Sequence, residues 1–380
     1  MTDWLDWPFF EPRHGELAKQ LEAWCAANVG QEHGDNIDAA CRALVEKLGR
    51  AGFLNLCVAS GDQRPDVRSL AIARSILARH SGLADFAFAM QGLGSGAISL
   101  FGSDEQRAEW LPKVAAGEAI AAYALTEPDT GSDAANIGMR AETTADGWVL
   151  TGEKSYISNG TIANVLTVFA RTGSPEDGAR GISAFIVRGD DPGLSIAERI
   201  AVIAPHPLAR LTFDGVKADL LGNEGEGFTV AMQTLNLFRV TVGAAALGFA
   251  RRALDEALQF ATTRRLGDGV LADNPVTWDR LAGMKLAVDA SELLVARAAW
   301  EQDHGIADNR RAAAMAKLHA TDEAQKVIDA AVQMHGGLGV TKGAKVEELY
   351  REIRALRIYE GASEVQRMII ARDMLKEHKS

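Results

Sequence analysis

Trp148-Val149-Leu150-Thr151-Gly152 is the first of three strand-like runs that decide the fold of this chain. The other two are Val165-Leu166-Thr167-Val168-Phe169 and Ile182-Ser183-Ala184-Phe185-Ile186-Val187. All three are short and rich in β-branched and aromatic residues, which is typical of strands. No helix-length pattern separates them, so we expect an antiparallel sheet or a small barrel and not a parallel α/β unit.

Helical patterns flank this β region on both sides. Between about residues 11 and 117, apolar residues recur at three- and four-residue spacing. Ser103 and Gln106 predict the start of one helix, and Pro112 predicts its end. Beyond Gly227 the helical pattern returns, in segments near 227–265, 276–304, 309–335, 346–357 and 363–377. The sequence therefore predicts an α+β fold with an N-terminal helical domain (1–119), a middle antiparallel β domain (120–222) and a C-terminal four-helix bundle (223–380).

The composition is that of an ordinary globular protein, with 47% hydrophobic and 24% charged residues among 380. The net charge of -11 argues against nucleic-acid binding, which needs a basic surface. The three cysteines lie in no metal-binding spacing, and we expect no metal site. The N-terminus lacks the apolar core of a signal peptide, and the nearly apolar stretch 240–250 is too short to cross a bilayer. We therefore expect a cytoplasmic protein without a membrane-spanning segment.

A second informative stretch is Arg357-Ile358-Tyr359-Glu360-Gly361-Ala362-Ser363. Glu360 stands between an aromatic residue and a glycine, just before an amphipathic helix. Glycine lets the backbone approach a ligand, and a helix N-terminus offers free N–H groups to a polarised carbonyl. Glu360 is therefore a candidate general base acting on a carbon acid. The alternative interpretation is a solvated entry to a helix.

A third stretch is Tyr123-Ala124-Leu125-Thr126-Glu127-Pro128-Asp129-Thr130-Gly131-Ser132-Asp133. A strand that ends at Thr126 leads into a Pro/Gly loop with several hydroxyl groups. Hydroxyls and free backbone N–H groups suit a heteroaromatic ring and anionic oxygens. Alternatively, the Asp and Ser side chains of this loop only stabilise their own turns.

Tyr156 and Ser158 lie two residues apart in a predicted strand, so their side chains should share one face. The ring of Tyr156 is suited to stacking on a flat ligand, and the hydroxyl of Ser158 to a hydrogen bond with its edge. A hairpin with a tyrosine on its packed side is the alternative.

Together these segments resemble the acyl-CoA dehydrogenases, a family of flavoproteins, over nearly the whole chain. The Tyr-x-Leu-Thr-Glu-Pro-x-x-Gly-Ser-Asp run and the Tyr-Glu-Gly run are both specific to this resemblance. It implies that FAD lies between the sheet and the C-terminal bundle. It also implies that the Thr126 hydroxyl lies near the pyrimidine side of the flavin and Ser158 near its N5 atom. The residues expected at the FAD are Tyr123, Leu125, Thr126, Gly131, Ser132, Tyr156 and Ser158.

The resemblance makes Glu360 the base that removes the α-proton of an acyl thioester while the β-hydride passes to the flavin. The thioester carbonyl would then accept hydrogen bonds from the Glu360 N–H and a flavin ribityl hydroxyl. Some relatives place their base on the first long helix of the bundle, where this chain has Phe238, which cannot act as one. Asn236 and Arg239 are expected at the pantetheine and pyrophosphate of CoA, although a solvated helix charge is the alternative for Arg239. The residues expected at the substrate are Ser132, Asn236, Arg239, Tyr359 and Gly361.

Gln333-Met334-His335-Gly336-Gly337 resembles the turn that receives the FAD diphosphate of a neighbouring subunit. In this comparison Gln333, Gly336 and Gly337 contact the diphosphate, and Arg264 meets it across the interface. Read by itself, the turn is a helix C-cap. The chain departs from the family pattern at Leu266-Gly267-Asp268-Gly269, at Pro275, at Ala362 and in the segment 206–210.

The function implied is FAD-dependent α,β-dehydrogenation of an acyl-CoA in fatty acid metabolism. An electron-transfer flavoprotein is the expected electron acceptor, and a homotetramer built from dimers the expected assembly. The alternatives are a flavin oxidase or monooxygenase on the same scaffold, a dehydrogenase of carrier-protein-bound acyl groups, and a non-catalytic flavoprotein. Leu83-Ala84 stand where relatives acting on glutaryl-CoA carry an arginine, which disfavours that substrate.

Overall fold

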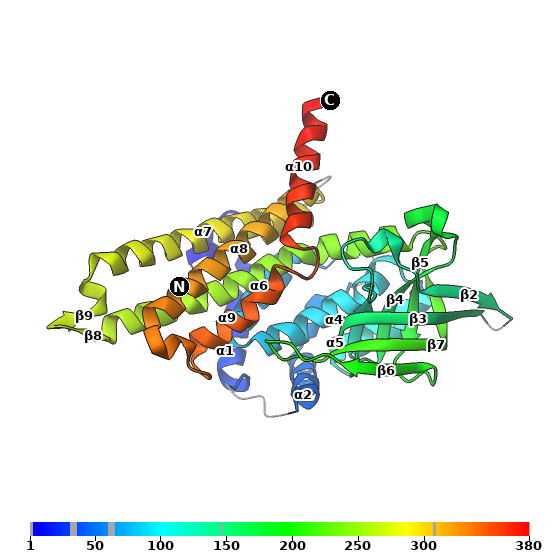
Figure 1. Cartoon of the computed structure of the whole chain (residues 1–380), viewed down its shortest axis with the longest axis horizontal. Helices are drawn as coiled ribbons and strands as arrows, with labels where there is room; N and C mark the ends of the chain where they lie inside the picture. The colour runs from blue at the N-terminus through cyan, green and yellow to red at the C-terminus, as the bar shows by residue number, and fades with distance from the viewer. Residues whose placement is uncertain (1–2, 31–35, 60–64, 146, 307–308, 380) are drawn as a thin grey trace. The chain divides into compact units, whose positions relative to one another are not determined.

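The computed structural model describes residues 3–30, 36–59, 65–145, 147–306 and 309–379 (Figure 1). Helices come first, strands follow, and helices return after Gly227, which confirms the order expected from the sequence. The chain packs into two compact units, each built from discontinuous segments. We call them the barrel unit (Gly30–Pro65 and Phe86–Phe238) and the helical unit (Met1–Val29, Asp66–Asp85 and Arg239–Ser380).

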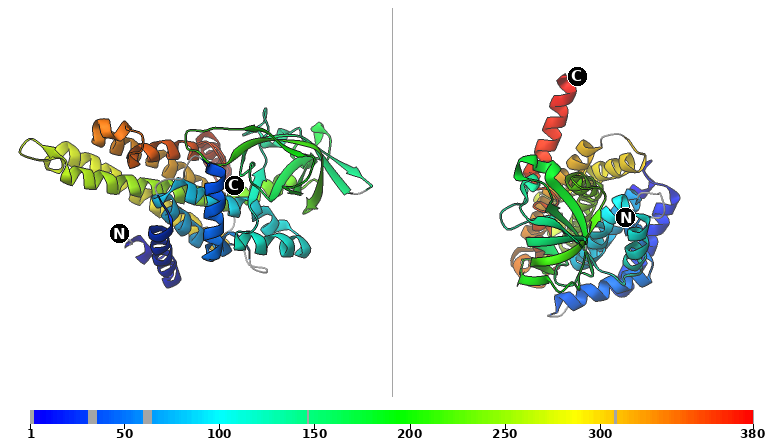
Figure 2. Two further views of the ribbon diagram at one scale, coloured as in Figure 1. Left: turned by 90° about the horizontal axis from the view of Figure 1, so that it is seen from below. Right: turned by 90° about the vertical axis from the view of Figure 1, so that its right-hand side faces the viewer.

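Seven strands form one sheet in the barrel unit. They are β1 (Ala121–Ala124), β2 (Arg140–Thr144), β3 (Gly147–Ser158), β4 (Val165–Arg171), β5 (Ile182–Arg188), β6 (Leu194–Arg199) and β7 (Leu208–Leu221). β4 pairs with β2, β2 with β3, β3 with β7, β7 with β5, and β5 again with β4, so five strands close into a ring. Of the two expected forms, an antiparallel sheet or a small barrel, the structure has the barrel. Its pairing is mainly antiparallel; β4 pairs in parallel with β1 and, through one residue pair, with β2. The curved strands can be followed in Figure 2.

The interior of the barrel is filled by apolar side chains from most of its strands, because side chains alternate between the two faces of each strand. β4 is buried along its whole length. The largest contributors to this core include Leu150, Ile157, Phe185, Leu211 and Phe213. Burial on both faces explains why the β4 segment reads as a continuous apolar run.

Helix α4 (Gly82–Phe101) packs closely on the barrel through its glycines. A Cβ atom at Gly94 would lie 2.7 Å from Ala121 of β1, and one at Gly96 would lie 2.5 Å from the ring of Phe238. Gly92 meets the same ring. These glycines therefore serve helix packing. Phe238 is a core residue and not a replacement base.

Helices α2 (Ile37–Arg50) and α5 (Asp104–Ala116) complete the barrel unit. The predicted start of α5 is confirmed, because Ser103 and Gln106 form a capping box. The predicted end at Pro112 is wrong, since the helix continues to Gly117, which has a φ of 74°. A proline here removes only one helical hydrogen bond, while Trp110, Leu111 and Val114 are all buried in the same helix.

The helical unit is built from long helices whose ends lie within two residues of those expected after Gly227. α6 and α7 are joined by the small hairpin β8 (Arg265–Leu266) and β9 (Gly269–Val270), and α7 runs beside α8 (Figure 1). The helices are α1 (Pro12–Asn28), α3 (Val67–His80), α6 (Gly227–Thr263, from Arg239 onward), α7 (Pro275–Asp303), α8 (Arg310–His335), α9 (Lys345–Leu356) and α10 (Ser363–Lys379). Short 3-10 helices lie at Asp3–Asp6, Phe53–Cys57, Ala134–Asn136, Pro175–Gly181, Leu271–Asp273 and Gly336–Val340.

Within the described residues, α6 is the one helix whose length and composition would let it cross a membrane. In the protein, 78% of its most apolar stretch is buried. Core helices of globular proteins can have the same length and composition, because a protein core and a membrane both favour apolar residues.

Candidate active site

Glu360 lies in the turn between α9 and α10. The backbone φ is 51° at Glu360 and 89° at Gly361, so two successive residues occupy the left-handed region. Among ordinary residues only glycine adopts this conformation without strain. A Cβ atom at Gly361 would also lie 2.6 Å from Gln366 Nε2. The shape of the turn therefore requires glycine directly after Glu360.

Lys317, on α8, holds the two residues on either side of Glu360. Its Nζ donates to the carbonyl oxygen of Tyr359 at 3.0 Å and to that of Gly361 at 2.7 Å. Gln366 Nε2 donates to the same Gly361 oxygen at 2.8 Å. Burial lowers the pKa of Lys317 to about 8, although the Glu360 charge opposes the shift.

Asp322, one turn further along α8, ties the flanks of the turn. It accepts hydrogen bonds from Arg357 at 2.7 Å, Ser363 at 3.2 Å and Arg367 at 2.8 Å. The turn is therefore fixed at both ends by one carboxylate.

The carboxylate of Glu360 is half-buried. Its Oε2 atom is shielded from solvent and has no hydrogen-bond partner among the described residues. Burial raises the pKa of Glu360 above its ordinary value of 4.5, and the Asp85 charge acts in the same direction. Arg74, Lys317 and Arg239 oppose the rise without cancelling it. The interpretation as a solvated helix entry is therefore wrong, and the carboxylate has the properties of a general base.

A buried ion pair near this turn escaped sequence reasoning. Arg74 on α3 donates to both carboxylate oxygens of Asp85, at 2.9 and 2.8 Å, and to the Thr241 hydroxyl at 3.1 Å. Burial lowers the pKa of Arg74, but the Asp85 charge reverses the shift, so the net change is upward. The only signal in the sequence is that the charged Arg74 lies between two apolar segments, 70–73 and 76–78.

Arg239 is buried, with 6% of its surface exposed. Burial lowers its pKa, and the Glu360 charge opposes this shift. The alternative of a solvated helix charge is therefore wrong. Asn236 lies one turn earlier on α6 and is half-buried. Contact of either residue with CoA stays a prediction.

In the barrel unit, the loop after β1 is held by Glu127, a residue whose role the sequence did not reveal. The Glu127 carboxylate accepts hydrogen bonds from Lys154 Nζ at 2.8 Å and from the backbone N–H groups of Gly138 and Met139 at 2.6 and 3.0 Å. Lys154 also donates to the Leu125 carbonyl at 3.0 Å. Burial lowers the pKa of Lys154 to about 8, against the effect of Glu127.

This loop and the end of β3 present hydroxyl groups that have no partner in the described parts of the chain. The side-chain hydroxyls of Thr126, Ser132 and Ser158 make no hydrogen bond to the described parts of the chain. Asp133, by contrast, bonds its own turn by accepting from Asn136 at 2.6 Å. The alternative of self-satisfied turns therefore holds for Asp133 and not for Ser132. Gly131 is exposed, and a Cβ atom there would meet nothing within 4 Å.

The two predicted aromatic contacts differ in exposure. Tyr123 is buried, its ring packs on Phe169 at 5.0 Å, and its hydroxyl donates to the Ala231 carbonyl at 3.3 Å. Tyr156 has a φ of 56° and is 63% exposed, so a hairpin with a packed tyrosine is wrong. Tyr156 lies at an irregularity in the pairing of β3 with β7, so a face shared by Tyr156 and Ser158 stays a prediction.

The segment expected to face a neighbouring subunit forms the end of α8. Gly336 is the C-cap, with a φ of 59°, and Gln333, Gly336 and Gly337 are all exposed. His335 stacks on Phe260 with centroids 4.2 Å apart, as a packing residue does. Arg264 is exposed after α6. A contact of these residues with a diphosphate stays a prediction. Pro275, one departure from the family pattern, begins α7, where proline is favoured.

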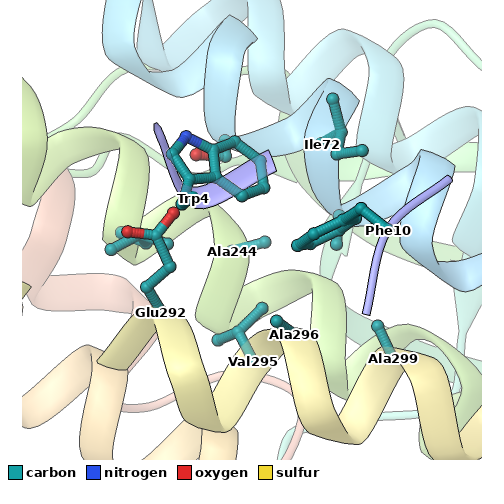
Figure 3. Close-up of a pocket in the computed structure, with 11 residues that line it drawn as sticks. Trp4, Phe10, Ile72, Ala244, Glu292, Val295, Ala296 and Ala299 are labelled. Atoms are coloured by element: carbon teal, nitrogen blue, oxygen red, sulfur yellow. The ribbon is translucent and has the colours of Figure 1, made fainter. Parts of the chain in front are cut away.

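Two cavities of the structure lie away from these residues. One, with a volume of about 10 Å³, lies in the helical unit among apolar side chains such as Phe10, Ile72 and Val295 (Figure 3). Its one carboxylate, Glu292, pairs with Arg251. A second, of about 310 Å³, lies in the barrel unit and includes residues of β6. Neither contains a predicted site residue.

Three family models match the chain in the expected order. They are the N-terminal domain of acyl-CoA dehydrogenases over residues 11–118, the middle domain over 122–216 and the C-terminal domain over 225–375. The chain belongs to the acyl-CoA dehydrogenase family. It is therefore an oxidoreductase, as the sequence predicts.

Curated relatives and solved structures cover nearly all of this acyl-CoA dehydrogenase. A 3-(aryl)acrylate reductase of Clostridium sporogenes is 34% identical, over 97% of this chain and 100% of the relative. The human mitochondrial short-chain specific acyl-CoA dehydrogenase is 36% identical, over 93% and 86% of the two chains. Butyryl-CoA dehydrogenase from Megasphaera elsdenii has a TM-score of 0.88 at 28% identity, covering 96% of this chain and 99% of that one. An acyl-CoA dehydrogenase from Bacillus anthracis, complexed with FAD, has a TM-score of 0.88 at 29% identity, covering 97% of this chain and 68% of that one.

Proposed function

We propose that the protein catalyses the FAD-dependent α,β-dehydrogenation of an acyl-CoA thioester, with Glu360 as the base that removes the α-proton. One observation carries this proposal. The Glu360 carboxylate is half-buried, its pKa is raised, and its Oε2 atom has no hydrogen-bond partner among the described residues. A base needs a free lone pair and a pKa nearer the working pH than that of an ordinary carboxylate.

The surrounding charges suit this task. Arg74, Lys317 and Arg239 favour the ionised carboxylate, whereas burial favours the protonated one. The net effect of these opposing influences is a carboxylate more basic than an exposed glutamate. The backbone N–H of Glu360 is the donor we assign to the thioester carbonyl, where negative charge develops as the proton leaves.

The residues of the barrel unit fit FAD as the cofactor. The unpaired hydroxyls of Thr126, Ser132 and Ser158 supply donors, and the exposed ring of Tyr156 supplies a flat apolar face. Tyr123, Leu125 and Gly131 complete the set assigned to the flavin. When bound, FAD accepts the β-hydride while the base takes the α-proton. The exposed Arg264, Gln333, Gly336 and Gly337 are assigned to the FAD diphosphate of a neighbouring subunit.

Five residues are assigned to the acyl-CoA. The burial of Arg239 favours a place at the pantetheine or thioester end of the substrate, because the pyrophosphate of CoA prefers solvent. The assigned residues are Ser132, Asn236, Arg239, Tyr359 and Gly361. We further propose an electron-transfer flavoprotein as electron acceptor, a homotetramer, a cytoplasmic location and a role in fatty acid metabolism.

A second candidate function is the reduction of an α,β-unsaturated acid. The 34% identity with a 3-(aryl)acrylate reductase over nearly the whole chain favours it. The double bond is then reduced: reduced FAD would supply a hydride to the β-carbon, and protonated Glu360 would deliver the proton to the α-carbon. A raised pKa serves this direction as well, because it increases the protonated fraction.

An anaerobic titration of the purified protein tests both candidates. Bleaching of the flavin by one member of a panel of acyl-CoA and acyl-carrier thioesters supports dehydrogenation. Reoxidation of chemically reduced flavin by an aryl acrylate, without such bleaching, supports the reductase. Rapid reoxidation by air with release of peroxide identifies an oxidase. Glu360→Gln should retain FAD and lose turnover with the active substrate, and near-normal turnover in this variant refutes Glu360 as the base.

A further inference from the structure

We propose that Lys317 is the positioning residue of the catalytic base, holding Glu360 in its reactive orientation by donating hydrogen bonds to the carbonyl oxygens of the residues on both sides of it. The inference rests on the proposed function, because it takes Glu360 as the base. It assigns a role to a side chain that the motifs of the sequence do not include. Lys317 lies 43 residues before Glu360 in the chain, on a different helix.

The backbone at Glu360 needs an external hold. Glutamate at a φ of 51° is in a conformation that L-residues rarely keep, and such strain persists where surrounding contacts enforce it. Gly361 removes the strain only at its own position. Left to itself, the Glu360 residue would relax toward a negative φ and swing its side chain to a new direction.

Lys317 provides that hold. It is completely buried, and its Nζ donates to the carbonyl oxygens of Tyr359 at 3.0 Å and Gly361 at 2.7 Å. Buried lysines usually pair with a carboxylate. Within the described residues, no carboxylate lies within salt-bridge distance of Lys317, and these two carbonyl oxygens are its hydrogen-bond partners. The Tyr359 contact fixes the peptide unit that leads into Glu360, and the Gly361 contact holds the turn that follows. Together they restrict the φ and ψ of Glu360 and with them the direction of its side chain.

Other contacts hold the turn as a whole, but among the described residues only Lys317 donates to the Tyr359 carbonyl. Gln366 also donates to the Gly361 carbonyl, and Asp322 binds Arg357 and Ser363 at the two flanks. Removal of the Lys317 ammonium should therefore leave the turn in place and release mainly the peptide unit between Tyr359 and Glu360. The expected defect is in the chemical step and not in folding or cofactor binding.

Lys317 also acts on the base through its charge. The charged or titratable groups that face Glu360 are Arg74 from α3, Asp85 from α4, Arg239 from α6, Lys317 from α8 and Tyr359 from the turn itself. Loss of Lys317 removes one of three cations that favour the ionised carboxylate. The acid limb of the pH profile of kcat should then move to higher pH.

The test compares Lys317→Met with Lys326→Met, a matched control on the same helix. Lys326 has 71% of its side chain exposed and pairs with Glu323. The substrate is the acyl thioester that bleaches the wild-type flavin fastest. For Lys317→Met we expect kcat to fall by about 10²-fold, the effect of a misplacement of roughly 1 Å. KM should stay within about threefold, since the contacts assigned to Ser132, Asn236 and Arg239 remain. FAD content should be unchanged, and the acid limb should shift upward. Lys326→Met should match the wild type.

A measurement that does not depend on catalytic turnover completes the test. Amide hydrogen exchange of the segment 357–363 should be faster in Lys317→Met and unchanged in Lys326→Met. Lys317→Gln keeps a hydrogen-bond donor without the charge, so its kcat should lie between that of Lys317→Met and wild type while its acid limb stays shifted. This variant also carries the test alone if Lys317→Met does not fold.

Two results overturn the proposal. One is a lysine variant with wild-type kcat, acid limb and amide exchange. The other is a loss of kcat in both Lys317→Met and Lys317→Gln that parallels a loss of bound FAD or of thermal stability. Lys317 would then have only a structural role. Glu360→Gln distinguishes a failure of the proposed function from a failure of the role proposed for Lys317. If Glu360→Gln keeps turnover, the proposed function fails. If Glu360→Gln is inactive while Lys317→Met is normal, only the inference about Lys317 fails.

Discussion

Lys154 Nζ lies 2.8 Å from Oε1 of Glu127, and this buried ion pair ties β3 to the loop that follows β1. Lys154 has none of its side chain exposed and Glu127 only 10%. The Glu127→Gln variant keeps the shape but leaves the Lys154 ammonium without a compensating charge. Breaking a buried pair from one side costs about 3–5 kcal/mol, so we expect the free energy of unfolding to fall by that amount in denaturant titration.

An exposed pair in the same barrel provides the control for this change. Glu142 lies beside Arg140 with both side chains about two-thirds exposed, at 67% and 69%. Glu142→Gln should change the free energy of unfolding by less than about 1 kcal/mol. Equal losses in the two variants would show that the burial of the Lys154–Glu127 pair is not what stabilises the loop.

Glu360→Gln should stabilise the folded protein at neutral pH while it removes activity. The pKa of Glu360 is higher in the folded protein than its ordinary value of 4.5 because burial disfavours the charge. The folded state therefore binds the proton more tightly, and this contribution is complete below the unfolded pKa and is lost as pH rises through the folded pKa. Glutamine has no proton to lose, so the melting temperature of the variant minus that of the wild type should grow as pH rises through this window.

Calorimetry on the FAD-bound forms of both proteins at a series of pH values measures this difference. A difference that does not depend on pH, or that is largest at the acid end, contradicts the raised pKa. Loss of turnover without the predicted pH trend would leave Glu360 essential and its basicity unexplained by burial.

Sequence reasoning succeeded where the signal is local. Helix ends after Gly227 follow from apolar periodicity and capping residues, and Glu360 was found because its motif is contiguous. The buried partners were missed because they are distant along the chain, 27 residues for Lys154 and Glu127 and 42 for Lys317 and the Tyr359 carbonyl. The identity of a residue does not show whether a lysine is solvated or buried, because its burial depends on the tertiary fold.

Pro112 shows where a local rule fails: it predicts the end of a helix that in fact continues. Proline is unfavourable inside a helix because it removes a hydrogen bond. In α5 the burial of Trp110, Leu111 and Val114 outweighs that local cost, so the helix runs on to its glycine cap. Tertiary packing overrides propensity here, as it often does.

Ser158→Ala should weaken FAD binding without destabilising the apoprotein. The Ser158 hydroxyl has no hydrogen-bond partner among the described residues, so the protein itself loses nothing when it is removed. A hydrogen bond to the cofactor is worth about 0.5–1.5 kcal/mol, which corresponds to a rise in the Kd for FAD of roughly 2- to 13-fold. Fluorescence titration of the apoprotein with FAD measures the Kd.

Ser183→Ala is the matched control for this hydroxyl. Ser183 is buried, shares a hydrogen bond of 2.8 Å with the Thr172 hydroxyl and accepts one of 2.9 Å from the Gly225 N–H. Its loss should lower the free energy of unfolding by about 1–3 kcal/mol. If Ser158→Ala destabilises the apoprotein to the same degree, the hydroxyl has a structural role and its assignment to the flavin fails.

Gly361→Ala should damage the catalytic turn, whereas Gly283→Ala should stabilise the protein. Gly361 has a φ of 89°, and an added Cβ atom would lie 2.6 Å from Gln366 Nε2, which itself holds the Gly361 carbonyl. Gly283 lies inside α7 with a helical backbone and nothing within 4 Å of an added Cβ atom. Alanine favours helix over glycine by about 1 kcal/mol, so Gly283→Ala should raise the free energy of unfolding by up to that amount.

Gly361→Ala should lower the free energy of unfolding by about 1–3 kcal/mol and reduce kcat with the FAD content unchanged, because the turn that carries Glu360 must change shape. Denaturant titration and steady-state kinetics on both variants check this pair, and wild-type kcat in Gly361→Ala would mean that the left-handed turn is not needed to place the base.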